Sequence, residues 1–184
     1  MPGVVSCASA PANCFTDMKP SRLAVDTNVL LDIADGEEDV LDAADVIADR
    51  LPDAEPLATP SVLDELAYLA DLGLTESVRQ SAGKAIQLLR HKDRFRPILE
   101  LPFAPEKVEE LAGEFRRRRL LPDDEIHDSL ILAEIVLLDC DILLTSDEHL
   151  RSIDHQQLTW LLNQRDLNAP VIATPREIVR KFFR

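Results

Sequence analysis

Apolar and polar positions follow two different spacings along the chain. Short apolar runs bounded by turn residues predict buried strands, and longer segments with apolar residues three and four apart predict helices. The strand segments are RLAV before Asp26, PLAT before Pro60, PILEL around Ile98, DILLT before Ser146 and PVIAT before Pro175. The helical segments are 39–51, 61–72, 76–90, 105–121, 124–138 and 175–183, with a short helical turn at 158–163. This alternation predicts an α/β fold: a three-layer α/β/α sandwich with a mainly parallel central sheet of about five strands.

The connection between the second and third strands contains two long helices, which is more than a minimal crossover needs. These helices either form a lid or arm or extend the helical layer, and the sequence is compatible with both. The 184 residues suit one domain. We expect a single domain at 21–184, preceded by a flexible extension at 1–20 that lacks the basic start and apolar stretch of a signal peptide.

Composition narrows the class of protein. The net charge of −14 argues against indiscriminate coating of nucleic acid, although it leaves room for a nucleic acid held locally. No apolar run reaches the roughly 20 residues of a membrane helix, so we expect no membrane association. The three cysteines, Cys7, Cys14 and Cys140, form no disulfide framework, which favours a cytoplasmic location.

Acidic residues stand where the pattern otherwise predicts core. Asp26 ends the first strand and Asp147 follows the fourth, so both belong at the carboxyl edge of the sheet, where α/β proteins bind ligands. Glu65 flanks the apolar stripe of its helix near the same edge. Asp128 falls close to the centre of an apolar stripe, where an ionised carboxylate is costly unless it is paired or bound to a metal. Asp124, one turn earlier, is either a helix cap or a further member of the site.

Converging carboxylates need positive charge, and none of these motifs contains Lys or Arg. The natural partner is a hard divalent cation, Mg²⁺ or Mn²⁺, as one or two ions. Such ions support phosphodiester hydrolysis, because they lower the pKa of an attacking water and stabilise the leaving oxygen. The competing interpretation makes each acid only a turn or cap residue, and it weakens if all four converge.

The motifs VDTNVLLD, TPSVLDEL, HDSLILAEIVLLDCDILLTSDEHL and PVIATPREIV occur in this order from about 22 to 174. This arrangement resembles the PIN domain family of metal-dependent ribonucleases, which includes VapC-like toxins and related stand-alone proteins. The resemblance implies cleavage of RNA at an acidic quartet of Asp26, Glu65, Asp128 and Asp147, with Asp124 as an occasional fifth ligand. It also implies that hydrogen bonds orient these carboxylates, with the candidate residues Thr27, Asn28, Thr145 and Ser146. Many small members of the family are toxins held inactive by an antitoxin protein, and many are homodimers.

The chain departs from the small toxins by its greater length and its acidity, which bears on the toxin role more than on the nuclease chemistry. Two other functions stay open: a non-catalytic module that binds RNA or protein, and a phosphatase or phosphoacceptor domain with Asp26 as nucleophile. For the latter, Asn28 stands where a second acid is usual.

A basic run precedes the helix that carries Asp128. Its residues are Arg116, Arg117, Arg118 and Arg119. The run is either a solvated helix face or a clamp for RNA phosphates, for which Arg is well suited. The four histidines, His91, His127, His149 and His155, show no metal-ligand spacing.

Overall fold

The fold was obtained as a computed structural model, which describes residues 21–91 and 94–182. The expected extension at 1–20, with Cys7 and Cys14, lies outside the described residues. Cys140 is buried. The elements in chain order are β1 (Arg22–Val25), α1 (Thr27–Asp35), α2 (Glu38–Arg50), β2 (Glu55–Ala58), α3 (Pro60–Leu72), α4 (Glu76–His91), β3 (Arg96–Pro97), α5 (Pro105–Arg117), α6 (Ile126–Leu137), β4 (Ile142–Leu144), α7 (Glu148–Arg151), α8 (His155–Asn163), β5 (Val171–Ala173) and α9 (Pro175–Phe182).

The strands form one parallel sheet in the order β3-β2-β1-β4-β5. β1 lies at its centre, between β2 and β4, with Ala24 paired to Leu57 on one side and Leu143 on the other. Three of its four residues, Leu23, Ala24 and Val25, are almost fully buried, as expected for a parallel strand covered on both faces. The predicted α/β fold with a parallel five-stranded sheet is confirmed.

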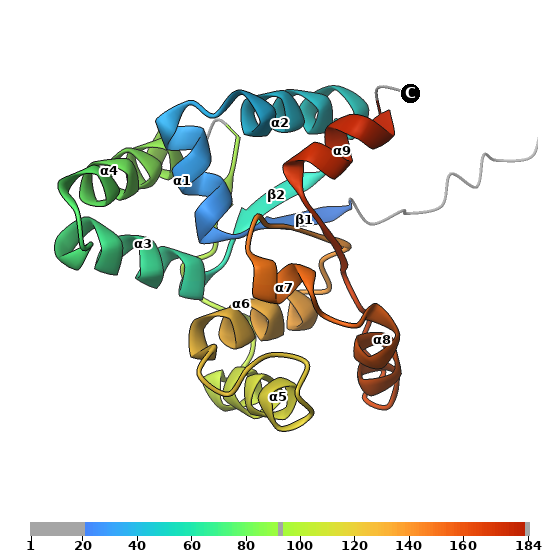
Figure 1. Cartoon of the computed structure of the whole chain (residues 1–184). Helices are drawn as coiled ribbons and strands as arrows, with labels where there is room; N and C mark the ends of the chain where they lie inside the picture. Colours follow the sequence, from blue (N-terminus) through green and yellow to red (C-terminus); the bar gives the residue numbers. More distant parts are fainter. Residues whose placement is uncertain (1–20, 92–93, 183–184) are drawn as a thin grey trace, which may run out of the picture.

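Helices cover both faces of this sheet. In the view of Figure 1, α2 and α9 lie above the sheet and pack on each other, and α5 and α6 lie below it and pack on each other. α4 packs on both α1 and α3. The two long helices after β2 therefore extend the helical layer, which decides between the alternatives that the sequence left open.

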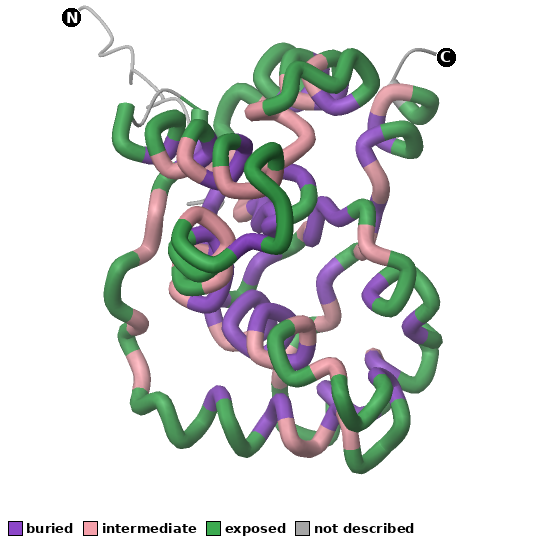
Figure 2. The backbone as a smooth tube through the Cα atoms, turned by 60° about the vertical axis from the view of Figure 1, so that its left-hand side comes forward, coloured by how far each residue is buried: buried purple, intermediate pink, exposed green. Residues whose placement is uncertain are grey.

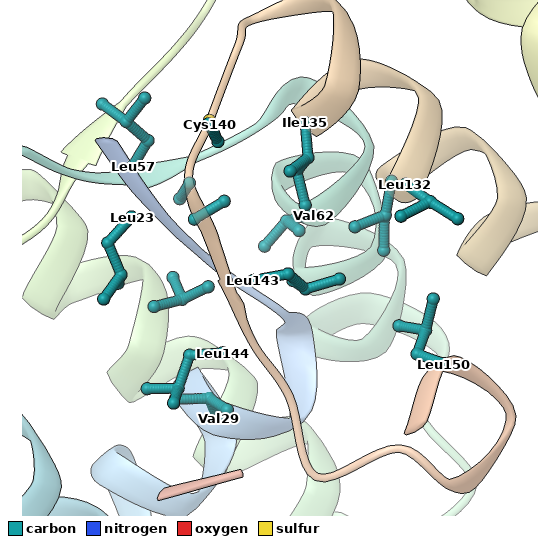
Figure 3. Packing of buried hydrophobic residues seen from close by; sticks show 14 of the residues in the cluster. Leu23, Val29, Leu57, Val62, Leu132, Ile135, Cys140, Leu143, Leu144 and Leu150 are labelled. Atoms are coloured by element: carbon teal, nitrogen blue, oxygen red, sulfur yellow. The ribbon is translucent and has the colours of Figure 1, made fainter. Parts of the chain in front are cut away.

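The buried side chains form one continuous core that runs through the sheet and its helices. Figure 2 shows buried backbone at the centre of the molecule and exposed backbone along the outer turns of the helices. Leu143 and Leu144 point to opposite faces of β4, because successive side chains alternate along a strand. Leu143 lies toward Val62 and Leu132, and Leu144 lies beside Val29 (Figure 3).

The observed elements differ from the predicted ones in two ways: two short helices were not predicted, and several elements have other limits than predicted. The helices α1 and α7 were not predicted, and both are short, with nine and four residues. The strand around Ile98 is only the two-residue β3, Arg96–Pro97, after which the Ile98 N–H donates to the Ala58 carbonyl at 2.9 Å. α5 ends at Arg117, before the predicted 121, and α6 begins at Ile126, after the predicted 124. In the described part of the chain, no helix combines the length and the apolar character that crossing a membrane requires.

Candidate metal centre

The strand order reverses between β1 and β4. From β1 the chain adds β2 and β3 on one side, and it then returns to add β4 and β5 on the other. At such a point the connections leave in opposite directions from adjacent carboxyl ends, which opens a crevice for ligands. Asp26 follows β1 and its N–H donates to the Leu144 carbonyl at 3.0 Å, while Thr145 and Asp147 follow β4. The acids predicted after the first and fourth strands therefore occupy neighbouring strand ends.

Asp26 is almost completely buried, with 2% of its surface exposed. It is the N-cap of α1: its Oδ1 accepts from the Thr27 N–H at 2.7 Å. Its Oδ2 accepts from the Thr145 hydroxyl at 2.8 Å. The pKa of Asp26 is raised to about 6, mainly by burial. The nearby charges of Glu65 and Asp147 contribute to this rise, and the hydrogen bonds from Thr145 and Thr27 oppose it.

The Thr145 side chain connects two acids of the site. Its hydroxyl donates to Asp26 Oδ2 and accepts from the Asp147 N–H at 2.9 Å. Asp147 in turn caps α7, because its Oδ1 accepts from the His149 and Leu150 N–H groups at 2.7 and 3.1 Å. Thr145 is fully buried, so the positions of both carboxylates depend on a side chain locked in the core.

Thr27 plays a corresponding part for Glu65. The Thr27 hydroxyl donates a hydrogen bond to Glu65 Oε2 at 2.6 Å, and the Thr27 backbone N–H donates one to Asp26 Oδ1. Thr27 is 1% exposed, whereas Glu65, on the second turn of α3, is partly buried. One buried threonine thus links the acid after β1 to the acid on α3.

Asp128 lies in the first turn of α6 and is partly buried. Its pKa is raised to about 7, mainly by burial and also by four carboxylates: Asp147, Asp26, Glu125 and Glu65 in decreasing order. These four groups must lie close enough for their charges to act on Asp128. The structure therefore brings the four predicted acids together, joined by Glu125, which was not predicted.

A second unexpected residue belongs to the same cluster. The Nδ1 of His149, on α7, lies 2.9 Å from Oε1 of Glu125. Ligand atoms of Glu125, Asp128 and His149 all lie within 4.8 Å of one another, a spacing that can hold a metal ion. His149 shows no ligand spacing in the sequence because its partners belong to a different helix.

Three other predicted residues are not part of this cluster. Asp124 is exposed and is not among the carboxylates that raise the pKa of Asp128, and the N-cap of α6 is Glu125. Asn28 is exposed, and its side chain makes no hydrogen bond to another described residue. The Ser146 hydroxyl is directed to Asp32 Oδ2 at 3.5 Å and not to an acid of the quartet. Orientation by hydrogen bonds is therefore seen for Thr27 and Thr145 only.

The basic run lies at the end of α5, which packs on α6. Arg116 donates a hydrogen bond to the Ser129 hydroxyl, one residue after Asp128, and Arg118 pairs with Glu114 at 3.6 Å. Arg117, Arg118 and Arg119 are exposed. Arg116 thus fastens the helix that carries Asp128, and the other three remain candidates for contact with phosphates.

Glu134 is a buried acid that the sequence reasoning passed over. It lies on α6 with 4% of its surface exposed, and burial raises its pKa. Its carboxylate accepts from the Ser61 N–H at 3.1 Å and from the Ser61 hydroxyl at 2.8 Å. Glu134 therefore caps the first turn of α3, whose own N-cap residue Thr59 makes no side-chain cap hydrogen bond. The signal was present in the sequence, because Glu134 interrupts the apolar stripe of a core helix.

These residues fit a divalent cation. The four predicted acids and Glu125 offer only carboxylate oxygens, which are the ligands that hard ions such as Mg²⁺ and Mn²⁺ take. The raised pKa values of Asp26 and Asp128 show that the free site resists full ionisation. A bound cation would remove that repulsion, and the hydrogen bonds from Thr27 and Thr145 would hold the carboxylates in place.

Comparison with known proteins agrees with this fold. Two solved structures share it with TM-scores of 0.55 and 15% sequence identity: VapBC2 from Rickettsia felis bound to a DNA fragment from their promoter, and VapBC-1 from nontypeable Haemophilus influenzae. The matches cover 83% and 84% of this chain and 98% of each of those chains. No curated protein matches the chain. The family model of the PIN domain matches residues 23–156, which include all four predicted acids. The chain therefore belongs to the PIN domain family.

Proposed function

We propose that this protein is an endoribonuclease that depends on Mg²⁺ or Mn²⁺ and hydrolyses phosphodiester bonds of RNA. The observation that carries the proposal is the convergence of Asp26, Glu65, Asp128 and Asp147 at the point where the strand order reverses. Membership of the PIN domain family supports it.

Each side chain has a part in this chemistry. Asp26, Glu65, Asp128 and Asp147 would hold one or two ions, which when bound lower the pKa of water and stabilise the leaving oxygen. Thr145 holds Asp26 relative to Asp147, and Thr27 holds Glu65 relative to Asp26. The exposed Arg117, Arg118 and Arg119 would contact phosphates of the strand, while Arg116 supports the helix of Asp128.

The test is cleavage of an unstructured RNA by the metal-free protein after addition of Mn²⁺ or Mg²⁺. We expect cleavage with either ion, none with EDTA, and a loss of at least about 100-fold in Asp26→Asn and Asp128→Asn, because each removes a charged ligand. The matched pair Glu65→Gln and Asp64→Asn separates the site from general acidity. Asp64 is exposed beside Glu65 on α3, so Asp64→Asn should retain the wild-type rate. Equal cleavage by wild type and Asp128→Asn would exclude the proposed site.

A non-catalytic module that binds RNA or protein is the alternative, and the net charge of −14 favours a protein partner in that case. Binding of RNA or protein without any metal-dependent cleavage, unchanged in Asp26→Asn, would establish it.

The proposal extends to a partner. The two solved structures named above are of VapBC proteins. The resemblance implies that such a nuclease can be a toxin that acts on RNA in the cytoplasm and is inhibited by an antitoxin. A neighbouring small open reading frame is the place to look for that partner. Growth arrest on expression of this chain, relieved by co-expression of the neighbour and absent in Asp128→Asn, would support the toxin role. Light scattering of the purified chain would decide whether it is a homodimer.

A further inference from the structure

Beside the carboxylate cluster lies a ring nitrogen, that of His149, which can act as a metal ligand. His149 Nδ1 lies 2.9 Å from Glu125 Oε1, and both residues together with Asp128 place ligand atoms within 4.8 Å of one another. His149 belongs to α7 and the two acids belong to the start of α6. Two consecutive helices, separated in the chain by β4, thus bring an imidazole and two carboxylates to one point.

Local hydrogen bonds fix this placement. The His149 backbone N–H donates to Asp147 Oδ1 at 2.7 Å. The backbone that carries the imidazole is therefore hydrogen-bonded to an acid of the quartet. Glu125 is the residue before α6, and its side chain makes no cap hydrogen bond to that helix. The Glu125 carboxylate is therefore available to the cluster, and 28% of its side chain is exposed, against 48% for His149.

A plain ion pair between His149 and Glu125 does not account for the arrangement. Asp128, the third member, has no hydrogen-bond donor and no basic side chain as a partner among the described residues, although four other carboxylates act on it. One imidazolium could offset only one of these negative charges. An ion shared by all three groups would satisfy the oxygens of Glu125 and Asp128 and the nitrogen of His149 together.

A nitrogen ligand changes which ion is favoured. Mg²⁺ takes oxygen ligands almost exclusively and keeps several waters, whereas imidazole suits the transition metals and raises their affinity relative to Mg²⁺. We infer that His149, with Glu125 and Asp128, forms a metal site that prefers Mn²⁺ over Mg²⁺, which makes His149 the residue that determines metal choice. This inference rests on the proposed metal-dependent function, and it names the ion that the site selects.

The test measures binding of each ion alone to the full chain. Mn²⁺ affinity is followed by electron paramagnetic resonance of free Mn²⁺, and Mg²⁺ affinity by its competition for the Mn²⁺ site. We expect wild type to bind Mn²⁺ at least about ten times more tightly than Mg²⁺. His149→Ala should weaken Mn²⁺ binding about tenfold or more and change Mg²⁺ binding less than about threefold, because only the nitrogen ligand is lost.

Two variants complete the design. His155→Ala is the matched control, because His155 is exposed on α8 and contacts Thr159 of its own helix. It should leave both affinities unchanged. Glu125→Gln should weaken both ions, because it removes a charged oxygen ligand. Circular dichroism and thermal unfolding confirm that each variant is folded.

The outcomes separate the inference from the proposed function. Two outcomes would overturn the inference while wild type still cleaves RNA with metal. In one, His149→Ala keeps the preference for Mn²⁺ over Mg²⁺; in the other, wild type shows no such preference. The nuclease proposal stands in both. If Mn²⁺ selectivity depends on His149 but RNA is not cleaved, the metal site stands and the nuclease falls. If wild type binds neither ion, both are overturned.

Discussion

At the scale of single residues, the acids of this site have two structural duties at once. Asp26 caps α1 and Asp147 caps α7, as the cap interpretation expects, and both carboxylates also belong to the cluster around Asp128. Asp147 uses Oδ1 for both cap hydrogen bonds, which leaves Oδ2 for another ligand. A residue that caps a helix directly after a parallel strand is held at the carboxyl edge of the sheet. Ligands of α/β proteins bind at this edge.

Thr145→Val tests the most buried hydrogen bond of the site. Valine keeps the shape but removes the hydroxyl that donates to Asp26 Oδ2 and accepts from the Asp147 N–H. We expect a loss of about 1–3 kcal/mol in the free energy of unfolding and a fall of about 10- to 100-fold in Mn²⁺ affinity. Urea unfolding and metal titration measure the two effects. Thr145→Ser retains the hydroxyl and should stay near wild type, as should Ser146→Ala.

Asp128→Asn should make the metal-free protein more stable at pH 8. The pKa of Asp128 is raised from 3.8 to about 7 in the folded protein, so folding favours its protonated form. That contribution to stability is lost progressively as pH rises from the unfolded pKa to the folded one, and the loss is complete at pH 8. The amide removes the charge that causes this loss. After allowance for the partial exposure of the carboxyl, we expect a gain of up to about 1 kcal/mol, or about 2–4 °C in Tm. The difference should shrink as pH falls and vanish only below about pH 4, where the unfolded chain is protonated at this group as well. A variant less stable than wild type at pH 8 would contradict the prediction.

At the scale of elements, the site depends on how α3 and α6 are joined. Glu65 lies on α3 and Asp128 on α6, and the buried Glu134 of α6 caps α3 through Ser61. Ser61 is one helical turn before Glu65. Glu134 therefore fixes the start of the helix that carries Glu65 relative to the helix that carries Asp128.

Glu134→Ala should lower the free energy of unfolding by about 1–3 kcal/mol, because it leaves the Ser61 N–H and hydroxyl without their buried acceptor. Glu134→Gln keeps one carbonyl acceptor and should cost less. Thermal unfolding compares the two variants. If Ala and Gln behave alike, the cap is not what Glu134 contributes.

The sequence predicted the central elements better than the small ones. β1, β4 and the edge they share were evident because buried parallel strands are short apolar runs with clear limits. α1 was missed although Asp26 and Gly36 mark its ends: Gly36 has φ 81°, the left-handed conformation that closes a helix. Glu125 and His149 could not be found from spacing, since only the packing of α6 and α7 brings them together. Asp124, one residue away from Glu125, was chosen because the start of α6 was placed two residues too early.

At the scale of the whole molecule, negative charge dominates. The chain has a net charge of −14, and several of its acids meet at one edge of the sheet. A divalent ion that binds only the folded protein stabilises it by mass action. That stabilisation has to depend on pH, because carboxylates must lose their protons to bind the ion.

We therefore expect Mn²⁺ to raise Tm more at pH 8 than at pH 5.5. At pH 5.5, below the pKa values of about 6 and 7 for Asp26 and Asp128, protons occupy these acids. At pH 8 the carboxylates of the metal-free site are ionised, and their mutual repulsion destabilises the folded protein. A bound ion removes this repulsion. Differential scanning calorimetry at both pH values, with Asp26→Asn as control, checks this. A shift that is equal at both pH values would mean that the ion binds elsewhere.

The hydrogen bond from Thr145 to Asp26 joins residues that are 119 positions apart in the chain. During translation, Asp26 and Glu65 are synthesised well before β4, so the early nascent chain cannot assemble the full set of acids. Premature termination anywhere before Asp147 yields a product that lacks at least one acid of that set. Because β4 and Asp147 come late in the chain, the proposed metal centre cannot assemble until they have been translated.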